Sequence, residues 1–400
     1  MKKGVLLTLI VVAAACIPAF AQVAEDWQSI VAKAKGQTVY WNAWAGDENT
    51  NSFIAWVSKR VKEDYQIDLR HVKISLTSES VSRVVAEKAA GRDTGGSVDM
   101  IWINGENFLA MKDQGLLFGP FTQLLPNFQL VDTEGKPTTV IDFTVPVDGM
   151  EAPWRMAQIV YVYDALRLPE PPRSIPGLLE WARENPGRIT HPQVRNFLGS
   201  TFLKQALYEL VEDTDILGKP ATDANFATVT APLWAWYEEL KPLMWRRGEQ
   251  FPESGPAMRQ LLADNEIDIM ISFSPNEAST AISKGLLPDS VRTYVLDKGT
   301  IGNTSFNAIP YNAANKEGAL VVINFLLSPE SQAHAQNPEV MGNFTVLDHD
   351  RLSPGERRLF TDLPRGPATL SDAELGRPLP EPHPSWMDRI VATWEQRYSR

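Results

Sequence analysis

Polar and aromatic side chains follow several predicted strands of this chain, at the point where each strand ends. The apolar segment 38–43 contains Asn42 near its end, and Trp44 comes directly after it. A second apolar segment, 98–103, is followed by Asn104, Glu106 and Asn107. Tryptophan rings with a nearby carboxylate suit an organic cation, although sugars also stack on tryptophan. The pattern predicts a small-molecule site, unless Trp44 packs in a core instead.

Further candidates lie at strand ends in the second half, on the joining segment and on a strand near residue 305. They are Tyr161, Tyr163, Ser274, Asn276, Trp154, Asn303 and Phe306. Glu106 has two interpretations, because a carboxylate there could pair with a cation or simply favour the N-terminus of a helix. The residues together predict a polar and aromatic cage, and none of them has the spacing of a metal site.

Motifs for enzymatic chemistry are missing from the sequence. It has no nucleophile elbow, zinc-protease helix, phosphate-binding glycine loop or calcium loop. The five histidines are scattered without metal-ligand spacing. Glu238 and Glu239 are adjacent on a predicted helix and point in different directions, which is typical of a solvated face. These features disfavour an enzyme, but a secreted hydrolase of glycans or esters stays an alternative, because glycosidase carboxylates can be distant in sequence.

The N-terminus has the features of an export signal. A basic start at Lys2 and Lys3 is followed by the apolar run 5–15 and by the sequence Ala-Phe-Ala at 19–21. This order predicts a signal peptide at 1–21, cleaved near Ala21, and therefore a periplasmic protein. Cys16 would be lipidated in a lipoprotein, but the residues just before it are all alanine and lack the usual leucine.

The composition excludes several classes of function. Cleavage after Ala21 would remove Cys16, the one cysteine, so neither disulfides nor a thiol nucleophile would remain. The net charge of −11 makes the chain a poor candidate for binding nucleic acid or anionic membranes. A length of 400 residues exceeds what one hydrophobic core usually serves, so we expect two domains.

The order of elements predicts an α/β fold. Strand-like segments at 38–43, 67–74 and 98–103 alternate with helical stripes, which indicates βαβ units in a parallel sheet. Ligands of such sheets bind beyond the carboxyl ends of the strands, where the candidate residues lie. A later strand at 304–309 must stop at Pro310, which has no N–H to donate, and a helix follows it.

The chain resembles a known family of transport proteins. The stretches VDMIWINGENF (98–108), IVYVYDA (159–165), IDIMISFSPNEAS (267–279) and the segment 299–333 occur in the order found in type II periplasmic binding proteins, the extracellular solute-binding proteins of ABC importers. The stretch WINGENF together with Asn307-Ala308-Ile309-Pro310 is similar to the YnjB-like branch, which is related to thiamine, polyamine and iron binders.

This resemblance implies a two-lobe fold in which each lobe is a mixed, mostly parallel sheet flanked by helices. Residues 22–147 and 297–336 would form the first lobe, and 148–296 with 337–400 the second. A small solute would be held in the cleft by closure of the lobes and delivered to an ABC permease in the inner membrane. The protein would act as a monomer without a cofactor, and Asn303 and Phe306 would lie at the hinge edge of the cleft.

The resemblance also bears on the ligand. Ferric-iron binders of this kind usually offer adjacent tyrosines, whereas Tyr161 and Tyr163 are separated by one residue, which disfavours iron. We expect thiamine or another small organic cation. Besides the hydrolase, a third hypothesis is a solute-binding protein that serves a membrane sensor instead of a permease.

Overall fold

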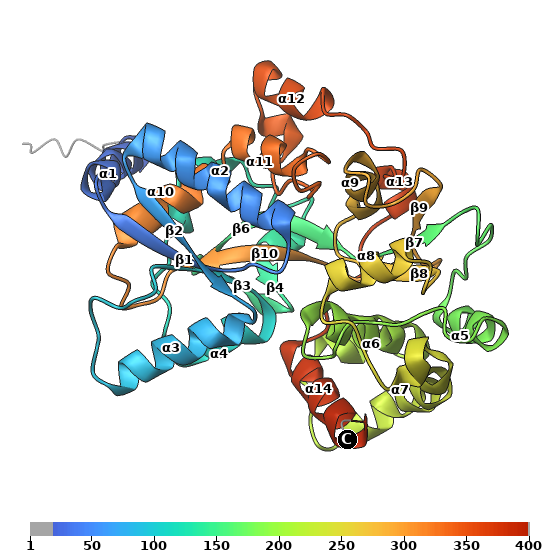
Figure 1. Cartoon of the computed structure of the whole chain (residues 1–400). Coiled ribbons are helices and arrows are strands. Elements are labelled where there is room, and N and C mark those ends of the chain that lie inside the picture. The colour runs from blue at the N-terminus through green and yellow to red at the C-terminus, as the bar shows by residue number, and fades with distance from the viewer. Residues whose placement is uncertain (1–18, 399–400) are drawn as a thin grey trace, which may run out of the picture.

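A five-stranded sheet forms the centre of the first lobe, in the order β2-β1-β3-β10-β6 (Figure 1). This computed structural model describes residues 19–398. The strands are β1 (Thr38–Trp44), β2 (Asp68–Ile74), β3 (Met100–Ile103), β6 (Glu151–Gln158) and β10 (Gly302–Ala308). β1 runs parallel to β2 and β3, as predicted, and β10 returns antiparallel to β3 and β6.

Helices cover both faces of this sheet (Figure 1). On one face, side chains such as Val57 and Leu320 pack with Trp41 of the sheet, and on the other Val84 and Phe108 pack with Phe306. The helices of this lobe are α1 (Ala19–Ala34), α2 (Glu48–Tyr65), α3 (Thr77–Ala89), α4 (Gly105–Asp113), α10 (Lys316–Leu326), α11 (Pro329–Gln336) and α12 (Pro354–Thr361).

The second lobe has a smaller sheet, in the order β8-β7-β9. Its strands are β7 (Val160–Asp164), β8 (Ile269–Ser272) and β9 (Val291–Tyr294), and its helices are α5 (Ile175–Glu184), α6 (Phe197–Leu210), α7 (Phe226–Leu240), α8 (Gly255–Ala263), α9 (Glu277–Ser283), α13 (Asp372–Leu375) and α14 (Pro384–Tyr398). β7 is antiparallel to both neighbours, which differs from the mostly parallel sheet expected here. Short apolar runs do not encode strand direction.

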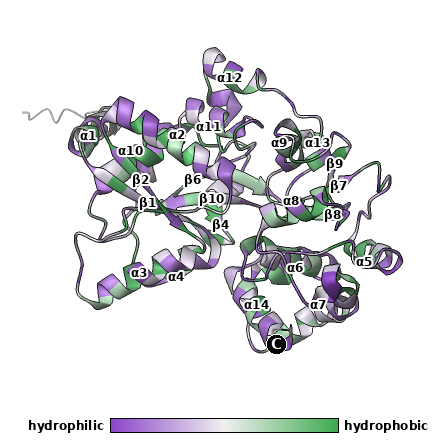
Figure 2. Ribbon diagram, in the orientation of Figure 1, coloured by the Kyte–Doolittle hydropathy of each residue, from purple (hydrophilic) through white to green (hydrophobic). Residues whose placement is uncertain are grey.

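The helix α6 lies at the centre of the second lobe. Its residues are buried from Leu198 to Glu209, and it is hydrophobic along most of its length (Figure 2). Leu203 and Leu207 share one core with Trp236 of α7 and Trp394 of α14. A helix buried on several sides holds its own polar groups in fixed positions, so Lys204 of α6 is placed rigidly inside the protein.

The lobes divide at other residues than those expected. β6 pairs with β10 in the first sheet, so the chain crosses at Ile159, directly after β6, and not at residue 148. After α11, Val346 and Phe360 still pack in the core of the first lobe, whereas Ala368 and Trp386 belong to the core of the second. The tail therefore joins the second lobe only after residue 360.

The predicted signal peptide and Cys16 fall largely on residues 1–18, outside the described residues. The helix α1 carries Trp27. Across residues 19–398, no helix combines the length and the apolar character needed to cross a membrane.

Gly342 lies in the tail between α11 and α12, where the tail packs closely against the start of α9. It has φ +66°, and a Cβ there would lie 2.4 Å from Asn276 Cβ at the start of α9. Gly376, at φ +64°, has open space around it. We therefore predict that Gly342→Ala lowers the free energy of unfolding by roughly 1–3 kcal/mol more than Gly376→Ala does, as measured by urea denaturation. Equal losses would show that only backbone conformation matters at Gly342.

Candidate functional site

Trp44, the last residue of β1, is held by the loop that follows this strand. Asp47 caps α2 by accepting a hydrogen bond from the Thr50 backbone N–H at 3.0 Å. Between them, Gly46 passes directly over the indole, because a Cβ on Gly46 would lie 2.3 Å from Trp44 Cζ2. The ring of Trp44 is thus held by the loop while its side chain stays partly exposed.

Three tryptophans and an arginine form a connected cluster beneath this loop. The Trp44 and Trp102 rings meet edge to face at 6.4 Å, and Trp102 meets Trp154 in the same way at 5.0 Å. The Arg155 guanidinium lies over both inner rings, with Cζ 4.2 Å from the Trp102 centroid and 5.1 Å from the Trp154 centroid. Its Nε donates to Ser305 Oγ at 3.3 Å. We call these five residues the arginine–tryptophan cluster.

A β-bulge explains how two successive residues of β6 join this cluster. Arg155 pairs with Ser305, but the next pair along the ladder is Pro153 with Phe306, so Trp154 is the extra residue. A bulge bends its strand and re-aims side chains, and such bulges are common beside functional sites. Trp154 consequently packs into the first-lobe core, and its neighbour Arg155 remains partly exposed.

The electrostatic surroundings of Arg155 are unusual. Within residues 19–398, no carboxylate oxygen lies within 4.0 Å of its guanidinium, and its two Nη groups donate no hydrogen bond. Burial lowers the pKa of Arg155 to about 9, and the nearby charge of Asp47 opposes this effect. The side chain therefore lies deep in the protein and still reaches solvent, as expected of a group that lines a cleft.

The two lobes touch on both sides of this region. At one side, Lys284 Nζ, just after α9, donates to Asn49 Oδ1 in the first turn of α2. At the other side, α14 packs against α4. A row of aromatic rings also joins the lobes, since Phe143 lies 6.0 Å from Phe197 and Phe197 stacks on Phe273 at 5.1 Å. The described arrangement is thus one in which the lobes are in contact.

A buried ion pair lies next to these rings. Lys204 Nζ is 2.6 Å from Glu381 Oε2, and both side chains are almost completely buried. The same Nζ lies 4.8 Å from the Phe143 and Phe197 ring centroids. Asn303 Nδ2 donates to the other Glu381 oxygen at 2.8 Å. A cavity of about 100 Å³ adjoins the pair and is lined by residues of β10, the tail and the segment 138–144.

Glu106 is the one carboxylate among the predicted site residues, and its pKa is raised. Its Oε1 accepts from Asn107 Nδ2 at 2.7 Å, and its buried Oε2 has no partner among the described residues. Burial raises the pKa of Glu106 to about 7; the Lys204 charge opposes this, and Asp388 and Glu381 reinforce it. Glu106 therefore changes its charge near neutral pH at the contact between α4 and the second lobe.

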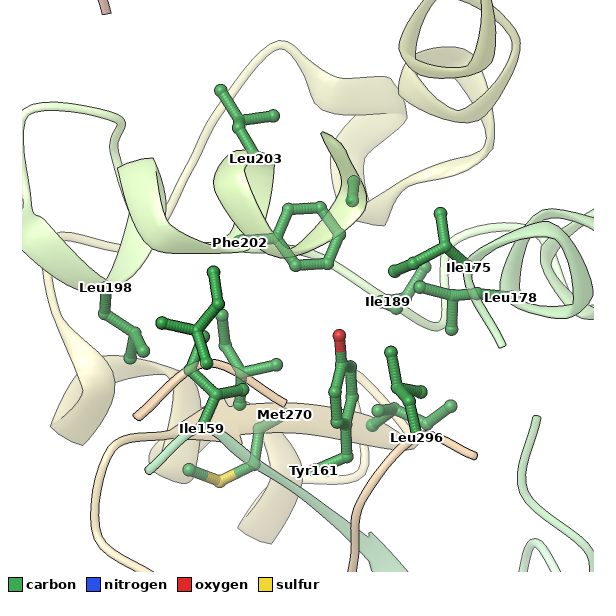
Figure 3. Close-up of a cluster of buried hydrophobic side chains, with 14 of the residues drawn as sticks. Ile159, Tyr161, Ile175, Leu178, Ile189, Leu198, Phe202, Leu203, Met270 and Leu296 are labelled. Atoms are coloured by element: carbon green, nitrogen blue, oxygen red, sulfur yellow. The ribbon is translucent and has the colours of Figure 1, made fainter. Parts of the chain in front are cut away.

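Tyr161 lies away from any cleft, in the core of the second lobe. Its side chain is fully buried and stands among Ile159, Ile189 and Phe202 (Figure 3). Its ring stacks on Tyr294 at 5.2 Å. Tyr163 meets the same ring edge to face and is partly buried. The structure therefore gives these tyrosines a packing role.

Other predicted site residues also have structural partners. Phe306 is fully buried in the first-lobe core. Asn276 is committed to the tail, because its Nδ2 donates to the Gly342 carbonyl and its Oδ1 accepts from Thr369, both at 2.6 Å. Asn42 is buried and donates to Ser80 Oγ at 3.0 Å.

The remaining predicted residues lie at strand ends or at the contact between lobes. Asn104 is the N-cap of α4, and Ser274 follows β8, where its backbone N–H donates to Ser272 Oγ at 3.1 Å. Asn107 donates to Glu106, and Asn303 donates to Glu381, as described above. Trp44 and Trp154 are the two predicted residues that the structure brings into the arginine–tryptophan cluster.

Sequence reasoning missed Arg155, Trp102 and Lys204. Arg155 gave no usable signal, because its placement beside Trp102 depends on the bulge at Trp154. Lys204 gave no signal, since its partner Glu381 is 177 residues away.

A larger groove, of about 750 Å³, opens on the second lobe between α6 and residues 379–380. It is lined by Gln205, Tyr208, Asp215, Lys219 and Lys298, among others. These residues belong to the second lobe and its connections, so the groove does not lie between the two sheets.

Comparison with known proteins identifies the family. A family model described as bacterial extracellular solute-binding protein matches residues 56–349. The chain belongs to this family. A relative among curated proteins, Protein YnjB of Escherichia coli (strain K12), is 41% identical to this solute-binding protein over 376 residues, which is 94% of each chain.

Solved structures share the fold at low sequence identity. The periplasmic binding protein AfuA from Actinobacillus pleuropneumoniae, solved with exogenous fructose-6-phosphate bound, has a TM-score of 0.64 at 13% identity, covering 91% of this chain and 99% of that one. A periplasmic thiamin binding protein has a TM-score of 0.63 at 15% identity, covering 91% and 96%. The predicted two-lobe fold of type II periplasmic binding proteins is confirmed.

Glu106 gives a prediction about pH. Its folded pKa of about 7 exceeds the usual 4.5, so the extra stability from its protonation is present below pH 4.5 and is lost as pH rises through 7. Glu106→Gln keeps the shape and removes the titration. We predict that this variant gains about 2–3 kcal/mol over the unmodified protein between about pH 5 and pH 8, measured by urea unfolding at each pH. If the unfolding free energies of the variant and the unmodified protein change in parallel with pH, this account is contradicted.

Proposed function

We propose that this protein is the periplasmic substrate-binding component of an ABC importer, which holds a small solute between its lobes and delivers it to a membrane permease. Family membership supports the binding role, and the arginine–tryptophan cluster supports the location. The observation that carries the proposal is Arg155, which lies over Trp102 in the first lobe, partly exposed and without a carboxylate partner in the described chain.

The energetics of closure fit this role. A ligand stabilises the closed form only through contacts that form on closure. Shifting the lobes from 1:99 to 99:1 in favour of closure requires about 5.5 kcal/mol of differential binding. A ligand with micromolar affinity supplies about 8.2 kcal/mol in total. Direct contacts between the lobes, such as that of Lys284 with Asn49, are exposed and contribute little by themselves.

The remaining parts of the proposal concern export and partners. We infer that residues 1–21 are a signal peptide that sends the chain to the periplasm, where it works as a monomer without a cofactor. It would have no catalytic role, since its relatives in the family are solute-binding proteins. A hydrolase would need an acid and a base facing one open site, and Glu106 faces a closed contact between helices.

The ligand is a further part of the proposal. The sequence favours thiamine or another organic cation, and a structural relative is described as a thiamin binding protein. A cation of this kind needs a carboxylate beside the tryptophans. Asp47 is the nearest acidic group that affects Arg155, and its carboxylate already caps α2. The nearby carboxylate that a cation would need is therefore already engaged within the first lobe.

Binding should be visible as thermal stabilisation. We predict that one member of a panel of vitamins, polyamines, sugars, sugar phosphates and amino acids raises the unfolding free energy by about 2.7 kcal/mol at a hundredfold excess over its dissociation constant. Differential scanning fluorimetry measures the effect. If no member of the panel shifts the transition, the proposed function is contradicted.

Trp44 should report binding directly. We predict that Trp44→Ala abolishes the change in tryptophan fluorescence caused by the solute found in that panel, and that it leaves far-UV circular dichroism unchanged, because the ring is at the surface of the cluster. Trp245→Ala is the matched control, since it removes a partly exposed indole from the second lobe. An unaltered signal in Trp44→Ala would remove this ring from the site.

A further inference from the structure

Half-buried arginines elsewhere in this protein are paired with carboxylates. Arg188 Nη2 lies 2.5 Å from Asp268 Oδ1, and Arg259 Nη1 lies 2.6 Å from Glu277 Oε1. Arg167 Nε lies 3.1 Å from Asp164 Oδ2. Arg155 breaks this rule, because no ion pair involves it within residues 19–398. A buried cation without a counter-charge is unfavourable, and structures retain one where something else supplies the charge.

The geometry of Arg155 shows which of its donors are available. The guanidinium is stacked on Trp102, and its Nε–H is used by Ser305. The two Nη groups, with four N–H donors between them, have no acceptor in the described chain. A planar fork held in this way by a ring and one hydrogen bond is already oriented to bind two oxygens of one anionic group.

Neighbouring carboxylates do not fill this role. Asp47 influences Arg155 through its charge, but its Oδ2 accepts from both the backbone and the hydroxyl of Thr50. Glu106 and Glu381 interact with Lys204 on the other side of the contact between lobes. Within residues 19–398, no carboxylate oxygen therefore lies within 4.0 Å of the Arg155 fork, and Asp47 acts on it only through its charge.

The cluster is also unsuited to a cation at the inner rings. The faces of Trp102 and Trp154 near the opening are occupied by the Arg155 guanidinium itself, which uses the cation–π attraction that a ligand cation would need. A second positive charge at this place would be repelled. The organic part of a ligand can still contact Trp44, whose side chain is partly exposed.

We propose that the transported solute carries an oxyanion, a phosphate or a carboxylate, which binds the two Nη groups of Arg155 while the organic part of the solute lies against Trp44. This inference rests on the proposed transport function and specifies its substrate class. Arg155 is then the residue that distinguishes an anionic solute from its neutral analogue, because a fork left without an acceptor in a closed site is strongly unfavourable.

Matched pairs of probes test this inference. The pairs are fructose 6-phosphate with fructose, thiamine monophosphate with thiamine, and nicotinate with nicotinamide, each titrated calorimetrically into the full mature protein. The first two pairs report on a phosphate and the third on a carboxylate. We expect the anionic member of at least one pair to bind at least tenfold more tightly than its partner.

Variants of Arg155 connect this preference to the guanidinium. Arg155→Gln should weaken binding of the anionic probe about 10- to 100-fold and leave binding of the neutral probe nearly unchanged, since one charged hydrogen-bonding group is lost. Arg155→Lys keeps the charge and loses the fork, so its affinity for the anionic probe should lie between those of the unmodified protein and Arg155→Gln. Arg246→Gln is the matched control, because Arg246 also lies over a tryptophan, with Cζ 4.3 Å from the Trp245 centroid. Far-UV circular dichroism confirms that each variant is folded.

The outcomes separate this inference from the transport function. Binding of a neutral or cationic probe that is indifferent to Arg155→Gln overturns the inference and leaves the transport function standing. An equal loss for both members of a pair also overturns it, since Arg155 would then only shape the site. Failure of every probe, including the wider thermal panel, overturns both proposals.

Discussion

An arginine stacked on two tryptophans of the first sheet without a carboxylate partner in the described chain is the constraint on which the proposed site depends. The β-bulge at Trp154, the ring of Trp102 and the hydroxyl of Ser305 together fix the guanidinium of Arg155. Each of these groups comes from a different place in the first sheet. In the proposed function, a solute supplies the missing acceptor for this charge when it binds. Binding and closure would then be coupled by electrostatics.

A second buried cation, Lys204, lies near the contact between the lobes and has a carboxylate partner. Lys204 carries a buried positive charge there, and Glu381 compensates it within the protein. Burial raises the pKa of Asp142 well above its usual range and that of Glu106 to about 7, which keeps excess negative charge out of the contact at mildly acidic pH. The charge of Lys204 is therefore compensated by an ion pair within the protein, whereas no ion pair in residues 19–398 compensates the charge of Arg155.

Much of the fold could be predicted from the sequence, because local patterns encode it. The strands β1 and β3 are mainly apolar runs, β2 alternates apolar with polar residues, and Pro310 marks the end of the return strand β10. The direction of β7 and the lobe of β6 could not be predicted, since strand pairing depends on residues far apart in the chain. The crossing was expected at residue 148, whereas β6 continues in the first sheet as far as Gln158.

The site could be predicted only in part. Trp44 follows a strand, and strand ends in such sheets meet ligands, so its position was accessible. Tyr161 and Phe306 also lie on strands, but period-two alternation does not say which face is the core, and both face it. Arg155 depends on a bulge, which one extra residue creates without any sequence signature. Its missing counter-charge is a property of three-dimensional neighbours alone.

Native mass spectrometry of the protein isolated from the periplasm under non-denaturing conditions tests the central claim most directly. The account predicts a mature chain carrying one small acidic molecule, with the added mass lost in Arg155→Gln and retained in Arg246→Gln. A folded mature chain without any added mass, or with an added mass that survives Arg155→Gln, would contradict it.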